Sequence, residues 1–473
     1  MTENVKKRSG KTVKFNKQKI QTAITKANYD VKNTNPTAKI MTKEDIAAVT
    51  AEVVSSLPDI KRVDIEDIQD KVEQTLMANG FYDIAKSYIL YRKKHQEQRE
   101  ATQKLMEQYK SILFVDAEYD DSKRENANIN TNSPMGIMLK LGTEGAKVYA
   151  NYYQLPDEFV TAEREGYVYY HDKDFSFITF NCLTTDLLKV FHGGFDTGHG
   201  SIREPQSIRS YAALAAISLQ SSQNDMLGGQ SISAFDVAMA EGVRKSFRKA
   251  VKEQIRQWLF FVDKSYSKED MFDIMEQVRE ENCHYSDDTN RTWQKDFETG
   301  VKEIRHVLKP WHCITEDATK IYLLACETVK EETHQAMESF LFNMNTLHSR
   351  AGSQTVFSSI NYGMDTTPEG RLVIREILNV TWAGMGKGET AIFPVQIFTL
   401  LEGVNYNESD INYDLFKQSM KVSAKRLYPN YTSQRAPYNY QYYKPDDYRT
   451  WVTSMGLTAR PFELFDKQVS YMV

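Results

Sequence analysis

The feature that most constrains this fold is a polar break between Asp116 and Ser133. This stretch is rich in Asp, Asn and Ser and has few apolar residues. It cannot bury enough apolar surface to join a core, whereas the sequence on either side can. The break therefore predicts two folding units, one over roughly the first hundred residues and a larger one after it.

Composition narrows the class of protein. The chain has 473 residues, 41% of them hydrophobic, and a formal net charge of −5. That charge argues against a protein whose main partner is nucleic acid. No stretch approaches the ~18 consecutive apolar residues that a membrane span needs, and the start has no secretory apolar region. We expect a cytoplasmic protein.

The four cysteines lie far apart in the sequence, at Cys182, Cys283, Cys313 and Cys326. No CxxC pair or other tight spacing is present, so the sequence predicts no zinc or iron–sulfur site. Free thiols in a reducing compartment are the simplest interpretation.

The first hundred residues show apolar side chains at spacings of three and four, typical of amphipathic helices. A short strand at Val13–Phe15 can pair as a hairpin before them. Four helices are predicted, starting at the N-cap Asn16, near Thr42, from about Asp64, and around Ala85–Lys94.

The larger unit alternates helical and strand-like segments without an obvious repeat, which favours an α/β or mixed α+β domain. Ala318–Phe340 is predicted to be helical and Ala391–Leu400 to be a strand. The stretch Tyr428–Tyr448 carries many Tyr, Pro and Asn residues and is predicted to be a surface or loop segment.

Cations gather near the N-terminus, at Lys6, Lys7, Arg8 and Lys19, close to a turn and a helix start. Cations and unpaired helix N–H groups together suit a triphosphate, although a solvated basic terminus is the alternative. The wider pattern decides between them: V-x-K-R-x-G, F-N-x-x-K-I, VDIEDIQDKVEQTL and A-x-x-Y-I-x-Y-R-K. It resembles the ATP cone found at the front of ribonucleotide reductases.

That resemblance implies a site for ATP and dATP as allosteric effectors. It implies that Lys7, Arg8 and Lys19 hold phosphates, and that Lys93 closes the site from the other side. The residues implied to lie near the base and sugar are Val5, Asn16 and Ile20.

Six runs in the larger unit resemble the catalytic domain of the anaerobic, glycyl-radical ribonucleoside-triphosphate reductases. They are KRENANIN, HDKDF, FNCLTTDL, SSQNDMLGGQSISAFD, HSRAGSQTVFSSINYG and LYPNY. The resemblance implies an α/β fold, with a four-helix, hairpin-capped ATP cone at 1–100 and a linker at 101–122. An incomplete ten-stranded α/β barrel is implied at 123–456, followed by an unrelated tail at 457–473.

In that family a glycyl radical passes its electron hole to a loop cysteine, and a second cysteine on a barrel strand donates to the substrate radical. Cys182, flanked by Asn181, matches the strand cysteine by resemblance. An isolated cysteine in an apolar strand is otherwise a packed core thiol, and Cys283, Cys313 and Cys326 are interpreted in that way.

Two glycine-rich turns could bring backbone N–H groups to a substrate triphosphate, with tight packing turns as the alternative. The substrate-binding candidates are Gly229, Gln230, Ser231, Ser353 and Gln354. His171 beside Asp172, and His199, could be acid–base groups, but a structural role is favoured for each.

The sequence departs from the family at the radical loop. The family has M-G-C-R-T, whereas this chain reads Met455-Gly456-Leu457-Thr458-Ala459. By resemblance Met455 is a catalytic-site candidate together with Cys182 and Asn181. Leucine has no S–H bond to host a thiyl radical, and the family's glycyl-radical loop and four-cysteine zinc site have no counterpart here. We expect no ribonucleotide reduction by this chain alone, whether it is a broken gene, a split gene or a regulatory paralogue.

The resemblance also implies partners: a ribonucleoside-triphosphate substrate, a radical S-adenosylmethionine activase, and a second copy of the chain in a homodimer. Formate or a thiol is implied as reductant. No nucleic-acid or membrane partner is expected. The alternative function is a non-catalytic protein that senses ATP or dATP. A repressor with an ATP cone is set aside, because that class has a zinc ribbon before its cone and no cysteine precedes Cys182.

Overall fold

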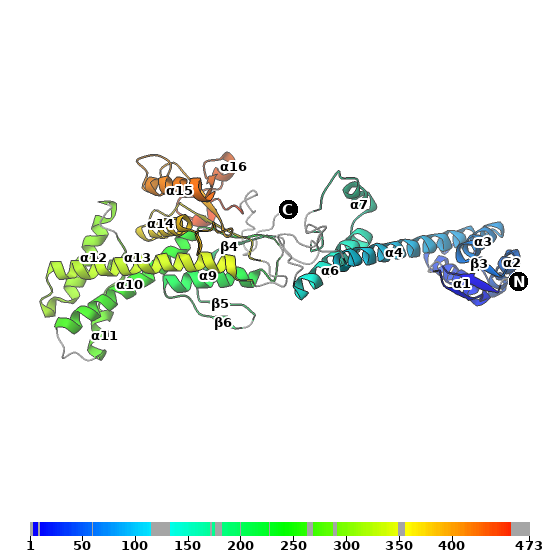
Figure 1. Cartoon of the computed structure of the whole chain (residues 1–473), viewed down its shortest axis with the longest axis horizontal. Coiled ribbons are helices and arrows are strands. Elements are labelled where there is room, and N and C mark those ends of the chain that lie inside the picture. The colour runs from blue at the N-terminus through cyan, green and yellow to red at the C-terminus, as the bar shows by residue number, and fades with distance from the viewer. Residues whose placement is uncertain are drawn as a thin grey trace. The chain divides into compact units, whose positions relative to one another are not determined.

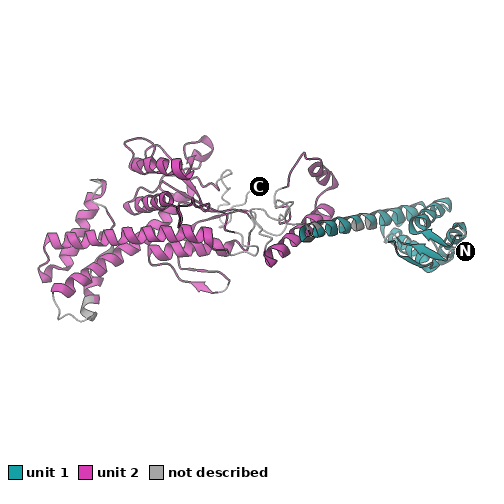
Figure 2. Ribbon diagram, viewed as in Figure 1, with its two compact units in different colours: residues 1–114 teal, residues 115–473 magenta. Residues whose placement is uncertain are grey.

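A computed structural model describes most of the chain as two compact units, residues 1–114 and 115–473 (Figure 2). The division falls within the region predicted as a linker. The described residues are 3–7, 10–58, 60–114, 133–170, 173–175, 182–198, 200–226, 228–262, 268–286, 291–348 and 355–455.

The first unit combines a small sheet with four helices (Figure 1). The sheet has the order β2-β1-β3, in which β1 pairs antiparallel with β2 and parallel with β3. Its strands are β1 (Asn4–Lys6), β2 (Thr12–Lys14) and β3 (Arg62–Asp64). Its helices are α1 (Lys17–Thr34), α2 (Lys43–Ser56), α3 (Ile65–Ala78) and α4 (Tyr82–Phe114).

The first two predicted helix starts are confirmed by their caps. The Asn16 side chain accepts a hydrogen bond from the Gln18 N–H at 2.9 Å, so it closes the first turn of α1. Thr42 and Asp45 form a reciprocal capping box at the start of α2. The fourth helix is much longer than predicted, because the polar residues after Lys94 continue it to Phe114.

The larger unit is built on a five-stranded sheet with the order β10-β9-β8-β7-β4, in which every neighbouring pair is parallel. The predicted α/β class is therefore confirmed, while the count of ten strands stays a prediction. The strands are β4 (Leu183–Thr185), β7 (Gln230–Ile232), β8 (Ser358–Tyr362), β9 (Val395–Leu400) and β10 (Asn430–Ser433). A separate two-stranded hairpin joins β5 (Phe195–Asp196) to β6 (Ser201–Ile202).

Helices connect the parallel strands, as such crossovers require. The long ones are α9 (Ile208–Ser222), α10 (Phe235–Val262), α13 (Thr315–Thr346) and α14 (Pro368–Ala383). The others are α6 (Pro134–Tyr149), α7 (Asp157–Arg164), α8 (Leu187–Phe191), α11 (Lys268–Glu276), α12 (Gln294–Val307), α15 (Tyr413–Arg426) and α16 (Pro437–Tyr440). Short 3-10 or π turns lie at Ala150–Gln154, Glu280–Asn282, Arg291–Trp293, Lys309–Trp311 and Tyr448–Thr450.

One prediction in this unit is wrong in part. Tyr428–Tyr448 was predicted to be a surface or loop segment; it lies at the surface, but it contains the strand β10, which pairs with β9. The strand is a short edge strand with only one of its four residues less than exposed, so its sequence lacks the apolar run that marks a central strand. The predicted helix over Ala318–Phe340 and strand within Ala391–Leu400 are confirmed by α13 and β9.

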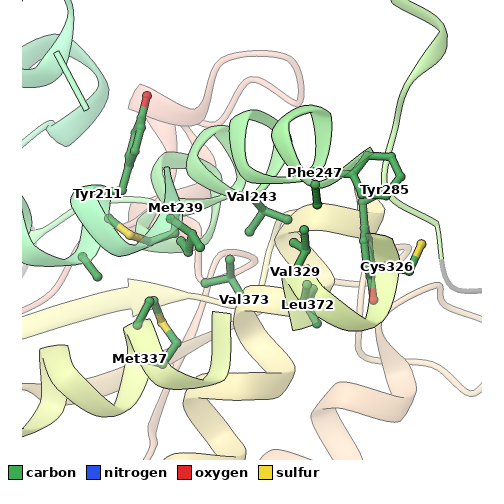
Figure 3. Packing of buried hydrophobic residues seen from close by; sticks show 14 of the residues in the cluster. Tyr211, Met239, Val243, Phe247, Tyr285, Cys326, Val329, Met337, Leu372 and Val373 are labelled. Carbon is green, nitrogen blue, oxygen red and sulfur yellow. The ribbon is translucent and has the colours of Figure 1, made fainter. Parts of the chain in front are cut away.

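A large apolar core lies where α9, α10, α13 and α14 meet (Figure 3). Tyr211 from α9, Val243 from α10, Val329 from α13 and Val373 from α14 all contribute to it. The core reaches the sheet through residues such as Ile232, which is fully buried. This packing leaves helices on one face of the sheet.

The rings of Phe235 and Phe340 are 5.2 Å apart in this core, and Phe340 is fully buried. We expect Phe340→Ala to lower the free energy of unfolding by about 3–5 kcal/mol, because it removes buried apolar area and leaves a cavity. Phe272→Ala is the matched control, since Phe272 on α11 is 57% exposed and should cost under ~0.5 kcal/mol. Urea unfolding of both variants measures the difference, and equal losses would contradict this core assignment.

Candidate functional site

The face of the sheet turned away from the helical core is polar along β4, β7 and β8. Strand register places Thr184, Ser231 and Ser359 in one row across β4, β7 and β8. Because side chains alternate along a strand, Asn361 lies on the same face as Ser359. Ser231, Ser359 and Asn361 are all at most 2% exposed. We call this surface the polar face.

The chain segment Val452–Ser454 is bonded to the polar face by side chains. The Ser454 carbonyl oxygen accepts hydrogen bonds from Ser231 Oγ at 2.9 Å, Ser359 Oγ at 3.3 Å and Asn361 Nδ2 at 3.1 Å. The Ser454 N–H donates to Asn361 Oδ1 at 2.8 Å. The segment is therefore fixed at both backbone groups of Ser454, two residues before Gly456.

A second buried amide holds the same segment one step earlier. Gln434, which follows β10 and is fully buried, accepts a hydrogen bond from the Val452 N–H at 2.7 Å. Val452 and Thr453 are only 5% and 7% exposed. Met455, a predicted catalytic-site residue, is the last described residue and lies half-buried directly after this segment.

Cys182 lies one residue before β4 and forms no disulfide. Residues two apart in an extended chain share a face, so continuing the alternation back from Thr184 assigns Cys182 to the polar face. The Leu183 N–H already bonds the Gly229 carbonyl at 3.1 Å, so pairing with the β7 chain reaches this point. Asn181 lies outside the described residues.

The glycine-rich turn before β7 is packed into the protein. The Gln230 amide donates to the Leu219 carbonyl at 2.7 Å, and the Gln230 N–H donates to Phe357. Ser231 donates to Ser454 and accepts from Asn361 at 2.8 Å. Gly229 is half-buried. Whether these residues contact a substrate stays a prediction, and Ser353, Gln354, His171, Asp172 and His199 lie outside the described residues.

The loop after β8 is organised around one buried carboxylate. Asp236 Oδ2, in the first turn of α10, accepts the backbone N–H groups of Gly363, Met364 and Asp365 at 2.8, 3.0 and 3.0 Å. Gly363 has φ +113° and lies against the Phe398 ring, so a side chain there would be strained and crowded. This carboxylate fixes the exit of the chain from β8.

Burial and the neighbouring Asp365 carboxylate raise the pKa of Asp236 to about 6, although backbone N–H donors act in the opposite direction. Burial also raises the pKa of Asp365. The remaining cysteines are buried on the helical side, where burial raises the pKa of Cys313 to about 11. Such a thiol is unreactive, which agrees with a structural role.

The basic residues of the small unit lie around its hairpin. Lys7 begins the turn between β1 and β2, where the Gly10 N–H donates to the Lys7 carbonyl and Gly10 has φ +79°. Lys7 lies opposite Lys11, and Asn16 lies five residues beyond Lys11, past the other end of β2, which is roughly 16 Å away at ~3.3 Å per residue. A ligand that contacts both must therefore be extended. Lys19 is exposed one turn into α1.

The other predicted residues of the small unit differ in exposure. Val5 and Ile20 are 6% and 7% exposed and belong to its apolar core, so they offer a ligand little surface. Lys93 is exposed on α4, beside Arg92, which makes ion pairs with Glu66, Asp70 and Glu73 of α3. Arg8 lies outside the described residues.

Two features are absent from the described part of the chain. No group of three or more His, Cys, Asp or Glu side chains there is arranged to hold a metal ion. No helix there combines the length and the apolar character that crossing a membrane requires.

Sequence reasoning missed Ser359, Asn361 and Gln434. The signal for the first two was present in S-S-I-N-Y, where polar residues occupy alternate positions of an otherwise buried parallel strand. No local signal marks Gln434, because its role depends on a backbone N–H eighteen residues further along the chain.

The raised pKa of Asp236 leads to a stability prediction. The folded state binds more protons than the unfolded state between the ordinary pKa of 3.8 and about 6, so this group's contribution to stability falls as pH rises through that window. Asp236→Asn removes the titration and keeps an acceptor oxygen. We expect the unfolding free energy of the native protein, relative to the variant, to fall by about 2–3 kcal/mol from pH 4 to pH 6.5. A difference that is constant over this range in urea titrations would contradict the assignment.

Comparison with known proteins places these features in a family. Residues 125–467 match the family described as anaerobic ribonucleoside-triphosphate reductase, and residues 3–97 match the ATP cone domain. The chain is 30% identical to the anaerobic ribonucleoside-triphosphate reductase of Salmonella typhimurium over 437 residues, covering 91% of this chain and 51% of that protein. The Escherichia coli protein of the same description is 29% identical over 436 residues, with coverages of 91% and 51%.

The chain thus spans about half the length of the curated relatives it matches. Among solved structures, the anaerobic ribonucleotide reductase from Thermotoga maritima in complex with dATP and CTP aligns with TM-score 0.41 and 12% identity, covering 72% of this chain and 50% of that one. The family match covers most of the present sequence. This chain belongs to the anaerobic ribonucleoside-triphosphate reductase family of oxidoreductases and carries an ATP cone at its N-terminal end.

Proposed function

We propose that this chain binds ATP and dATP through its cone and a ribonucleoside triphosphate at the polar face, but does not reduce ribonucleotides by itself. The observation that carries the proposal is the polar face, where buried hydroxyls and an amide from β7 and β8 lie beside the position assigned to Cys182. A sulfur there can exchange a hydrogen atom with a sugar only if bulk water is kept away. Burial of this face supplies that condition.

The proposed lack of turnover rests on the residue at position 457. Family members need a cysteine at the tip of the radical loop, and this sequence has Leu457 two residues after Met455. A C–H bond of leucine is far stronger than a thiol S–H bond, so leucine cannot relay a radical reversibly. Cys182 therefore remains as a potential hydrogen donor without the group that starts the reaction.

The proposal extends to effectors and partners. Lys7, Arg8 and Lys19 bind the phosphates of ATP or dATP, with Lys93 opposite, and Asn16 lies nearest the sugar. Cations and the donors of a helix start are what a triphosphate requires. We propose a radical S-adenosylmethionine activase and a second copy of this chain as partners; the glycyl radical and zinc are features of the family for which this sequence has no matching motif. We place the protein in the cytoplasm.

A purely nucleotide-sensing protein is the second candidate, and Leu457 is the observation that favours it. Both candidates require a working cone, whereas only the first requires the polar face to bind substrate. Binding of ATP or dATP alone, without any binding of CTP or another substrate triphosphate, would favour the sensor.

Titration calorimetry of the full chain with ATP and with dATP tests the cone. We expect Lys19→Met to weaken binding about tenfold, because a charge-assisted contact to phosphate is lost. Lys26→Met is the matched control: Lys26 is an exposed lysine on the same helix, outside the proposed site, and its loss should leave Kd within about twofold.

Two outcomes of this titration would count against the proposal. Absence of any heat change with either nucleotide in a folded protein would refute the nucleotide-binding function. Equal weakening by both substitutions would show that only the general positive charge of α1 matters.

A further inference from the structure

The segment Val452–Ser454 lies on the polar face without belonging to a strand. Its backbone is bonded by side chains from residues far away in the sequence, and two of these are fully or almost fully buried amides. Buried amides are costly unless they are bonded, so a pair that bonds one short segment is a specific arrangement.

Asn361 makes the central contact. Its oxygen accepts the Ser454 N–H and its nitrogen donates to the Ser454 carbonyl, at 2.8 and 3.1 Å. The side-chain amide thus copies the paired hydrogen bonds that a neighbouring strand residue would make. Its nitrogen also donates to Ser231 Oγ at 2.8 Å and to the Ile232 carbonyl at 3.1 Å, which locks the amide orientation.

Gln434 supplies the second fixed point. Its oxygen accepts the Val452 N–H, and its nitrogen donates to the Asn439 carbonyl at 3.3 Å. Its own N–H continues the β10–β9 ladder by donating to the Leu400 carbonyl at 3.0 Å. Two fixed points two residues apart determine both the position and the direction of the segment.

We infer that Asn361 and Gln434 are positioning residues, which hold Val452–Ser454 across the polar face and so shield Cys182. The inference rests on the proposed function in one respect, namely that the polar face is where substrate binds. The geometry supports it independently: Ser454 bonds Ser231, which pairs with Thr184, and Cys182 is two residues from Thr184. Strand spacings of ~4.8 Å across and ~3.3 Å along then put Cys182 within about 10 Å of Ser454.

The test measures two local properties of the intact chain, neither of which needs nucleotide or turnover. The first is amide hydrogen exchange in the peptide that contains Val452–Met455. The second is the rate at which iodoacetamide alkylates Cys182, read by mass spectrometry. The buried Cys283, Cys313 and Cys326 are internal reference thiols in every sample.

We expect Asn361→Leu to raise exchange in the 452–455 peptide about tenfold and to raise Cys182 alkylation by a similar factor, with the reference thiols unchanged. Asn361→Asp keeps an oxygen for the Ser454 N–H but loses the donor to its carbonyl, so its exchange rate should lie between those of the native protein and Asn361→Leu. Gln434→Leu should also raise exchange in the 452–455 peptide, because it removes the acceptor of the Val452 N–H at the other end of the segment.

Asn405→Leu is the matched control. Asn405 is also fully buried and its amide also bonds backbone groups, at Gly363 and Thr399, but among the described residues it forms no hydrogen bond with the 452–455 segment. It should loosen the loop after β8 and leave the 452–455 peptide and Cys182 unchanged. If Asn361→Leu fails to fold, Gln434→Leu carries the same comparison.

Two results would overturn the inference. One is native exchange and native Cys182 reactivity in folded Asn361→Leu or Gln434→Leu protein. The other is a uniform rise across all peptides and all four thiols, which would mean that these amides only stabilise the fold. Failure of nucleotide titration would not produce either result, so the two proposals fail separately.

Discussion

The alternation of side chains along parallel strands is the constraint on which the larger unit depends. Helices crowd one face of the five-stranded sheet, where Ile232, Ile360 and Phe398 enter the common core. The intervening residues must point the other way. On β7 and β8 they are Ser231, Ser359 and Asn361, whereas β9 presents Val395 and Ile397 there, so the opposite face is polar along β7 and β8 because of the residues that the sequence places at these alternate positions.

A buried polar face requires partners for its donors. The Val452–Ser454 segment supplies them, because the carbonyl of Ser454 accepts from three side chains at once. Ser231 would otherwise lose its hydration without replacement, whereas Ser359 and Asn361 have further acceptors at the Gln230 and Ile232 carbonyls. The bonds to Ser454 fix where the chain lies two residues before Gly456. The hydrogen bonds that satisfy these buried polar groups therefore also hold the Val452–Ser454 segment in place.

Local signals in the sequence were enough for the first helix starts of the small unit and for the general class of the large one. Asn16 and the Thr42–Asp45 pair predicted helix starts because a cap is decided within four residues. The end of α4 was not predicted, since nothing in the polar residues after Lys94 stops a helix. β10 was missed because an edge strand needs no apolar run.

The residues of the candidate site also divide into those that a short motif could predict and those that it could not. Cys182 and the glycine-rich turn before Ser231 were identifiable from short motifs, whereas Asn361 and Gln434 act on backbone groups that are distant in the sequence. Such contacts depend on strand order, which no local pattern contains. The alternating S-S-I-N-Y run was visible but shows only that a strand has a polar face, not what that face binds.

The central claim is that this chain keeps the reductase-type sheet and its strand cysteine but lacks the sulfur at position 457 that would start the radical reaction. Its most direct test is anaerobic incubation of the purified 473-residue protein with a radical S-adenosylmethionine activase, S-adenosylmethionine, formate and CTP, followed by chromatography of the nucleotides. The account predicts no deoxynucleotide above the protein-free blank. Deoxynucleotide formation that disappears in Cys182→Ser would contradict it.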